Sequence, residues 1–195
     1  MSRQDLVDLV RTAQRAPSWV NSQPWRVYCA TGATLERIKE RYAASAAAGR
    51  PGRSDFPVMH RTEWSEAARA KMADFSDQIR AHLGKDAQEF SASQGRLVNA
   101  PAVLYVTIPT GSSLSSVHDL DAFTAMLALA AFDKGLGAIN AYALVNRPDA
   151  VREVMGIGEE ETLATGIAVG HTAHSRLAAF APSHVDVEEI LTMRD

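Results

Sequence analysis

The ten residues from Ala16 to Trp25 constrain this chain more than any other stretch of it. They join an amphipathic helical segment to a strand-like segment, and they include two prolines, two tryptophans, an asparagine and a glutamine. Each proline fixes its own φ angle and biases the preceding residue toward extended backbone, so the connection is stiff. Two interpretations follow from these residues. The stretch is either a binding loop for a planar, hydrogen-bonding heterocycle or a structural turn whose tryptophans are buried.

The N-terminal half is expected to contain four helices around one strand. Ser2 is a helix cap, with Asp5 at the third helical position. The Cys29 segment alternates like a strand, and Gly84 separates two long helical patterns. The expected elements are a first helix from residue 2, a strand at 26–31, a helix from a cap at Thr34 to about residue 48, a loop at 49–57, and helices at 61–83 and about 86–98.

The C-terminal half supplies the centre of the fold. Residues 102–108 are apolar on both faces of a strand, as expected for a buried central strand. A helix opened by Asp119 runs to residue 134 and is almost wholly apolar from 120 to 132, which is typical of the middle of a molecule or of an oligomer interface. Further elements are expected as a strand at 138–144, a helix at 147–155 capped by Asn146, a strand at 165–170 and a short helical stretch at 187–191. We therefore predict a single α+β domain over residues 1–195.

Composition excludes several classes of function. The chain is 46% hydrophobic with a net charge of -3 and has no basic run, so neither nucleic-acid nor membrane-surface binding is expected. The longest apolar run, 125–132, is too short to span a bilayer, and no signal-peptide pattern opens the chain, which predicts a cytoplasmic protein. The histidines lack the spacing of a zinc site, so no metal is expected. The single cysteine, Cys29, is predicted to be a buried and inert thiol.

The order Ala-Pro-Ser-x-x-Asn-x-Gln-Pro-Trp in the first connection resembles the signature of the nitroreductase superfamily of FMN oxidoreductases. Two further segments resemble that family: an apolar helix that ends in Gly-Leu-Gly at 135–137, and the run from Asn146 to Gly170. The resemblance implies a central, mainly antiparallel sheet flanked by helices. It also implies an FMN cofactor, a small-molecule substrate and a homodimer that holds the flavin at the subunit interface.

The resemblance assigns ring contacts to the connecting loop and to a basic residue near the central strand. Ser18, Asn21 and Gln23 would contact the isoalloxazine ring. Arg96, with Ser93 on the same edge, would place positive charge on the pyrimidine side of the flavin, where it stabilises the reduced anion. The alternative for Arg96 is a solvated arginine that the dipole of a helix end favours.

A second turn would approach the reactive edge of the ring. Val145 and Asn146 match positions where the family sets backbone groups near flavin N5, although Asn146 is also an ordinary helix cap. Tyr142 is a candidate proton donor because it lies near this turn. No residue is identified as a catalytic base.

The phosphate side of the expected site departs from the family. Relatives usually carry arginines ahead of the first helix, whereas this chain begins at that helix. Relatives also place a basic residue near the C-terminus, where spacing gives Ser183 or His184 and local pattern gives Arg176. A phosphate needs charge-assisted hydrogen bonds to bind tightly. Arg3, Arg176 and His184 are the expected substitutes, unless a partner subunit or upstream residues supply the charge.

The resemblance leaves three functions open. The short length and the altered phosphate side are similar to the catalytic subunits of cyclic dipeptide oxidases, which introduce Cα–Cβ double bonds into diketopiperazines, pass electrons to oxygen and work with a small second subunit. The alternative is NAD(P)H-dependent reduction of nitroaromatic compounds or quinones. A flavin-binding protein or scaffold without turnover is the third interpretation.

Overall fold

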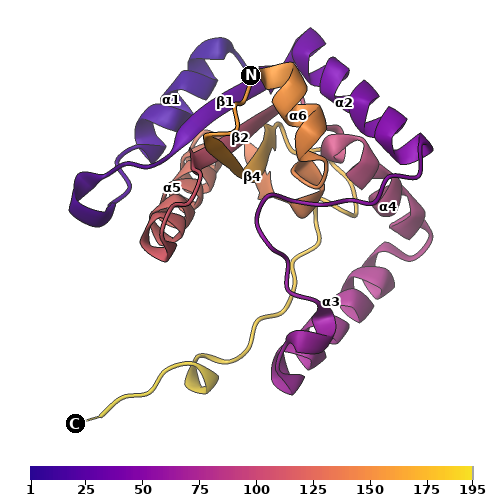
Figure 1. Cartoon of the computed structure of the whole chain (residues 1–195). Coiled ribbons are helices and arrows are strands. Elements are labelled where there is room, and N and C mark those ends of the chain that lie inside the picture. The colour runs from indigo at the N-terminus through magenta and orange to yellow at the C-terminus, as the bar shows by residue number, and fades with distance from the viewer. Residues whose placement is uncertain (195) are drawn as a thin grey trace. The chain divides into compact units, whose positions relative to one another are not determined.

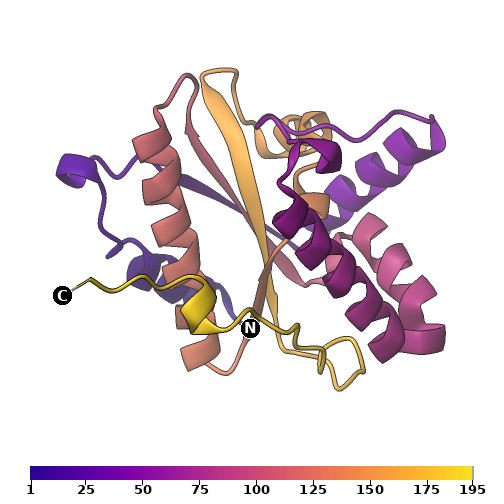
Figure 2. The same ribbon diagram turned by 90° about the horizontal axis from the view of Figure 1, so that it is seen from below.

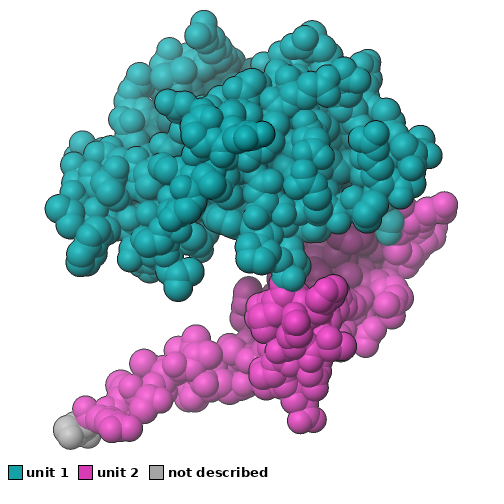
Figure 3. Space-filling model, in the orientation of Figure 1, with its two compact units in different colours: residues 1–58, 91–172 teal, residues 59–90, 173–195 magenta. Residues whose placement is uncertain are grey.

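The computed structural model describes residues 1–194. The chain divides into two compact units, coloured separately in Figure 3. Unit 1 comprises Met1–Val58 and Ser91–Thr172, and unit 2 comprises Met59–Phe90 and the chain from Ala173 onward. Unit 1 holds the whole sheet, while unit 2 is built on one long helix. The assignment of residues 1–195 to one domain stays a prediction.

A four-stranded antiparallel sheet with the order β1-β2-β4-β3 forms the centre of unit 1. Its strands are β1 (Arg26–Thr31), β2 (Ala102–Pro109), β3 (Gly137–Asn140) and β4 (Glu161–Gly170). Strand β2 is buried along both faces from Ala102 to Ile108, which confirms the central strand expected from its unbroken apolar run. The predicted α+β class with a mainly antiparallel sheet is therefore confirmed.

Helices cover both faces of this sheet (Figures 1 and 2). On one face, Leu104 and Val106 of β2 pack with α1 (Arg3–Ala13) and α5 (Leu114–Asp133). On the other face, Val103 and Tyr105 pack with α2 (Gly32–Ala47) and α6 (Pro148–Met155). Successive residues of a strand point to opposite faces, so β2 supplies both layers of the core. The Tyr105 hydroxyl is buried without a hydrogen-bond partner among residues 1–194.

The start of α1 is as predicted. Ser2 is the N-cap, and its hydroxyl accepts the Asp5 N–H at 3.1 Å. The Asp5 carboxylate in turn accepts the Ser2 N–H at 2.6 Å, which completes a capping box. The two residues that fix this helix start are only three positions apart in the chain, so the sequence pattern is sufficient to find it.

Several other boundaries were predicted wrongly. Helix α2 begins at Gly32 after the cap position Thr31, so Thr34 is not its cap. Helix α5 begins at Leu114, ahead of Asp119. Strand β4 begins at Glu161 because β2 continues to Pro109 and pairs with it there. Strand β3 ends at Asn140, and the residues expected to extend it form a 3-10 turn instead, η5 (Tyr142–Leu144).

Unit 2 contains α3 (Glu66–Leu83), the start of α4 (Ala87–Gly95) and the C-terminal segment from Ala173 onward, which packs against α3. Gln78 exchanges two hydrogen bonds with Ser183, at 2.5 and 3.0 Å, and the Phe180 ring lies 5.9 Å from that of Phe75. The remaining elements of the chain are 3-10 turns: η1 (Trp19–Asn21), η2 (Arg61–Glu63), η3 (Gly84–Asp86), η4 (Leu97–Asn99) and η6 (Val187–Glu189). The helices predicted at 61–83, 86–98 and 187–191 are therefore shorter than expected.

No helix within residues 1–194 has the length and apolar character needed to cross a membrane.

Candidate functional site

The connection Ala16–Trp25, which we name the signature loop, is held in one conformation by its own hydrogen bonds. The Ser18 hydroxyl accepts the Gln23 N–H at 3.0 Å, and η1 closes the turn between them. Val20, Asn21 and Gln23 have φ angles of 49°, 58° and 44°, in the left-handed region that L-residues rarely adopt. Such backbone costs on the order of 1–3 kcal/mol per residue and persists only where the surroundings enforce it.

Helix α5 holds the loop in this conformation by contacts to its middle and to its C-terminal end. The Asp119 carboxylate is buried and accepts the Trp19 N–H at 2.9 Å and the Ser22 hydroxyl at 3.5 Å. One helical turn later, the Phe123 ring stacks on Trp25 with centroids 4.9 Å apart. Asp119 therefore does not open the helix, as the sequence had indicated. It lies inside α5, and its carboxylate holds a loop 100 residues away in the chain.

The loop presents polar groups and apolar surface to its surroundings. The Gln23 Nε2 donates to Asn21 Oδ1 at 3.1 Å, while Asn21 Nδ2 and Gln23 Oε1 have no partner within residues 1–194. Ser18 keeps its own O–H as a donor. The Trp19 side chain is 71% exposed, whereas Trp25 is half-buried against α5. The interpretation as a turn with both tryptophans buried is therefore wrong for Trp19.

The second predicted contact region lies on the other face of the sheet. Val145 is buried in the layer formed with α2 and α6, and Tyr142 is 51% exposed at the start of η5. The Asn146 carbonyl accepts the Arg53 N–H at 2.9 Å. Asn146 is not the cap of α6, because Arg147 occupies that position and makes no side-chain capping bond. A single chain thus keeps this region apart from the signature loop, which packs on the α1 and α5 face.

Ser93 and Arg96 lie around the end of α4. Ser93 is buried, and Arg96 follows the last helical residue and donates through Nε to Asn99 Oδ1 at 2.9 Å. The turn after Arg96 is η4, whose three residues, Leu97–Asn99, all have left-handed φ angles of 51–57°. Strained backbone thus occurs within the signature loop and in the turn directly after Arg96. Arg96 also lies where the dipole of α4 favours a cation, so both interpretations of it remain.

Two of the three substitutes expected for the phosphate anchor lie in unit 2. Arg176 donates to the His82 carbonyl oxygen, and the His82 ring lies 2.7 Å from the carbonyl oxygen of Arg176. His184 is exposed. Binding of the flavin phosphate by Arg176 or His184 therefore stays a prediction.

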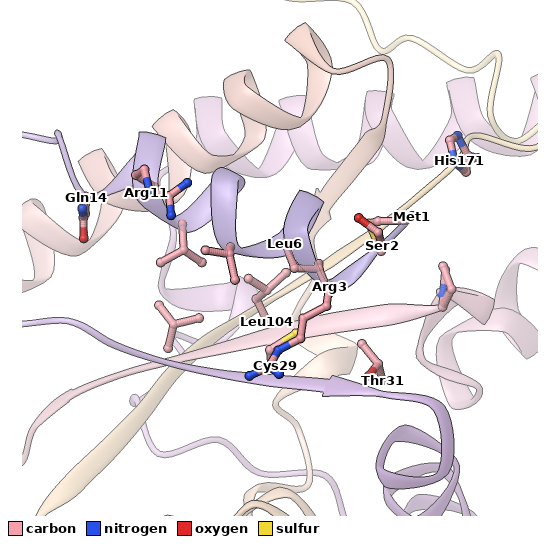
Figure 4. A pocket seen from close by; sticks show the side chains of 14 residues that line it. Met1, Ser2, Arg3, Leu6, Arg11, Gln14, Cys29, Thr31, Leu104 and His171 are labelled. Carbon is pink, nitrogen blue, oxygen red and sulfur yellow. The ribbon is translucent and has the colours of Figure 1, made fainter.

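The third substitute, Arg3, lines a cavity of about 930 Å³ between α1 and the strands β1 and β2 (Figure 4). Cys29 lines the same cavity and is exposed, so the prediction of a buried thiol is wrong. The reason is that β1 is an edge strand, and α1 leaves this part of it open. The surrounding protein still raises the pKa of the Cys29 thiol by desolvation, which keeps it protonated at neutral pH.

Sequence reasoning missed a carboxylate that ties three strands together. Glu161 is buried, and its oxygens accept hydrogen bonds from Tyr28 at 2.6 Å, Arg26 at 2.8 Å and Thr107. Burial alone would raise the pKa of Glu161, but the hydrogen bonds from Thr107 and Tyr28 and the Arg26 charge lower it overall. Its partners are distant in sequence, so no local pattern identified them. Among residues 1–194, no three His, Cys, Asp or Glu side chains are grouped as metal ligands would be.

Comparison with curated proteins finds relatives along most of the chain. A 4-nitrobenzoate reductase from Nocardioides sp. (strain LMS-CY) is 27% identical over 201 residues, which cover 97% of this chain and 81% of that protein. Nitroreductase NfnB from Mycolicibacterium smegmatis (strain ATCC 700084 / mc(2)155) is 28% identical over 165 residues, which cover 82% of this chain and 69% of that protein.

Solved structures show the same fold. The FMN-dependent nitroreductase NfnB from Mycobacterium smegmatis in complex with NADPH superimposes with a TM-score of 0.91 at 23% identity, covering 100% of this chain and 90% of that one. An FMN- and NADPH-dependent NfnB from Sphigopyxis sp. strain HMH gives 0.90 at 21% identity, with coverage of 100% and 91%. The nitroreductase family model matches residues 1–171. This chain therefore belongs to the nitroreductase family.

Proposed function

We propose that this protein is an FMN-dependent oxidoreductase that uses NAD(P)H to reduce nitroaromatic compounds. The observation that carries the proposal is the signature loop, whose strained backbone is fixed by Asp119 and presents Ser18, Asn21 and Gln23 outward. The relatives reported above are named as nitroreductases, so they favour this reduction over cyclic dipeptide oxidation. The oxidase activity and its small second subunit stay predictions, as does a cytoplasmic location.

The groups on the signature loop suit the edge of a flavin ring. Asn21 Nδ2 and the Ser18 hydroxyl can donate hydrogen bonds, and Gln23 Oε1 can accept one, which matches the carbonyls and the N–H of an isoalloxazine. Bound FMN would supply the capacity to accept hydride from the nicotinamide and to pass it to the substrate. The chain's part is to orient the ring through these polar groups and to exclude water with the exposed Trp19 side chain.

A complete flavin site of this kind requires two copies of the chain. The signature loop and Val145 lie on opposite faces of one sheet, so only the loop of a second copy can meet the Val145 turn of the first. The exposed side of α5 supports such pairing, because Leu129 and Phe132 are 68% and 81% exposed and share a face one turn apart. Exposed apolar side chains such as these, together with that of Trp19, are typical of an interface. We therefore include a homodimer with the flavin at its interface in the proposal.

The proposal is tested by purifying the protein and recording its flavin spectrum. The sample is then offered NADPH with 4-nitrobenzoate, and separately cyclo(Phe-Leu) under air. We expect a yellow protein that oxidises NADPH in the presence of the nitroarene. Hydrogen peroxide from the cyclic dipeptide, without NADPH oxidation, would establish the oxidase instead. A protein that stays colourless after incubation with FMN would overturn the flavin assignment.

A matched pair of variants tests the loop itself. Asn21→Ala removes a carboxamide that faces outward from the strained turn, whereas Gln14→Ala removes one from the end of α1, outside the loop. We expect Asn21→Ala to weaken FMN binding about tenfold, since hydrogen bonds to a bound ligand contribute ~1 kcal/mol or more. Equal FMN retention by both variants would return the loop to a structural role.

A further inference from the structure

Four arginines line a second cavity. Of the residues predicted to contact the flavin ring, Asn146 alone lines it. The cavity has a volume of about 430 Å³ and lies between the C-terminal half of α2, the loop at residues 50–53 and the start of α6. Figures 1 and 2 both show the loop that follows α2 running beside α6. The arginines are Arg41 from α2, Arg50 and Arg53 from the loop, and Arg147 from the residue before α6.

The charges around this cavity do not cancel. Arg41 pairs with Glu153 and Arg53 pairs with Asp149, each at 2.5 Å. Four guanidinium groups therefore face two carboxylates among the lining residues, which leaves two positive charges (four minus two) in a chain whose net charge is -3. Asp55 lies 3.8 Å from Arg53, but at 2.5 Å it is bound more closely to Arg152.

The two unneutralised charges belong to Arg50 and Arg147. The Arg50 guanidinium has no side-chain partner within residues 1–194. The Arg147 Nη1 donates to the Ser45 hydroxyl at 2.7 Å and to the Arg50 carbonyl at 3.1 Å, and both acceptors are neutral. These bonds hold the half-buried Arg147 in place and leave its charge available to a ligand.

The backbone around these side chains is fixed. The Arg53 N–H donates to the Asn146 carbonyl at 2.9 Å, which fastens the loop to the residue before Arg147. Gly52 lies beside Asn146, where an added Cβ would be in ordinary van der Waals contact, 3.5 Å from the Asn146 carbonyl oxygen. Helix α6 begins at Pro148, whose backbone nitrogen carries no N–H donor. Arginine forks held in this way match the oxygens of phosphate and carboxylate groups.

We propose that this cavity, which we name the arginine site, binds a compact oxyanion carried by one of the enzyme's own substrates. The inference rests on the proposed function, because Asn146 joins the arginine site to the Val145 turn assigned to the flavin. Two such anions fit the chemistry: the additional phosphate that distinguishes NADPH from NADH, and the carboxylate of a nitrobenzoate. Both are small, oxygen-rich and anionic, and the kinetics distinguish them.

The test compares Arg50→Gln with Arg37→Gln in the full-length protein loaded with FMN. Both substitutions remove one exposed arginine charge, but Arg37 lies on α2 outside the arginine site. KM is measured for NADPH against NADH, and for 4-nitrobenzoate against nitrobenzene. We expect Arg50→Gln to raise KM for the anionic member of one pair about five- to tenfold, as for a partly exposed charge-assisted hydrogen bond. The other three KM values should match those of the control.

Arg147→Lys provides a second variant that keeps the charge and removes the planar fork. We expect it to raise the same KM as Arg50→Gln by a smaller factor. If neither variant differs from Arg37→Gln for any anionic ligand, the arginine site is refuted.

A binding measurement separates this result from failure of the proposed function. Calorimetry with 2′,5′-ADP against 5′-AMP, and with 4-nitrobenzoate, requires no turnover. If the protein oxidises no NAD(P)H but binds one of these anions in an Arg50-dependent way, the arginine site stands and the reductase does not. Turnover with unchanged anion affinities refutes only the arginine site.

Discussion

One substitution can remove the hydrogen bonds by which Asp119 fixes the signature loop. Asp119→Ala removes the only acceptor that residues 1–194 offer to the Trp19 N–H outside the loop, and it leaves the strained backbone of Val20 without its anchor. A hydrogen bond to a charged acceptor contributes ~1.5–3 kcal/mol, and the low end applies because this one is only partly buried. Loss of ~1.5 kcal/mol lowers the equilibrium ratio of the binding conformation to other loop conformations about tenfold. The FMN dissociation constant should rise by up to the same factor.

The assay is titration of FMN into the apoprotein, followed by quenching of flavin fluorescence. Asp121→Asn is the matched control, because this exposed carboxylate lies on the same helix. Asp119→Asn keeps an oxygen acceptor and should bind FMN within about threefold of wild type. Thermal unfolding of the apoproteins shows whether a variant has lost stability generally. An Asp119→Ala dissociation constant within twofold of the Asp121→Asn value, in a folded protein, would refute the anchoring role.

Three further predictions concern assembly and stability. Phe132→Glu places a charge on the exposed face of α5, and light scattering should then show monomers where wild type shows dimers; an unchanged mass would contradict the proposed interface. The Thr107 and Tyr28 hydrogen bonds and the Arg26 charge hold the folded-state pKa of Glu161 below the ordinary glutamate value of 4.5. Its contribution to stability is therefore present above about pH 4.5 and is lost as pH falls through the folded-state pKa. Wild type should therefore exceed Glu161→Gln in unfolding free energy by less as the pH falls. A difference that does not change with pH would contradict this role of the Glu161 carboxylate. Tyr105→Phe removes a buried hydroxyl that lacks a partner among residues 1–194, so denaturant unfolding should show a gain of about 1 kcal/mol, whereas a loss would mean that the hydroxyl is satisfied.

Sequence predicted best where neighbours in the chain decide the outcome. The capping box of Ser2 and Asp5 and the alternation at 26–31 involve residues a few positions apart, and both elements were found. The unbroken apolar run at 102–108 identified the central strand for the same reason. Boundaries failed where a distant partner sets them. Strand β4 extends back to Glu161 because β2 pairs with it there, and nothing near Glu161 in the sequence records that pairing.

The candidate site likewise has features that the local sequence predicted and features that only distant contacts set. Residue types and their order in the signature loop were sufficient to predict a stiff connection and to indicate the family. Only the tertiary structure showed that Trp19 is exposed while Trp25 packs on Phe123. The arginine site was also invisible, because its four cations come from three separate segments.

Sequence alone therefore determined the chemistry of the signature loop, since its prolines, amides and aromatics are local properties of ten consecutive residues. The tertiary structure decided what holds that loop and where it lies. Asp119, 100 residues away, supplies the acceptor for the Trp19 N–H, and the sheet separates the loop from Val145. These relationships depend on chain segments that meet only after folding, so no local pattern encodes them.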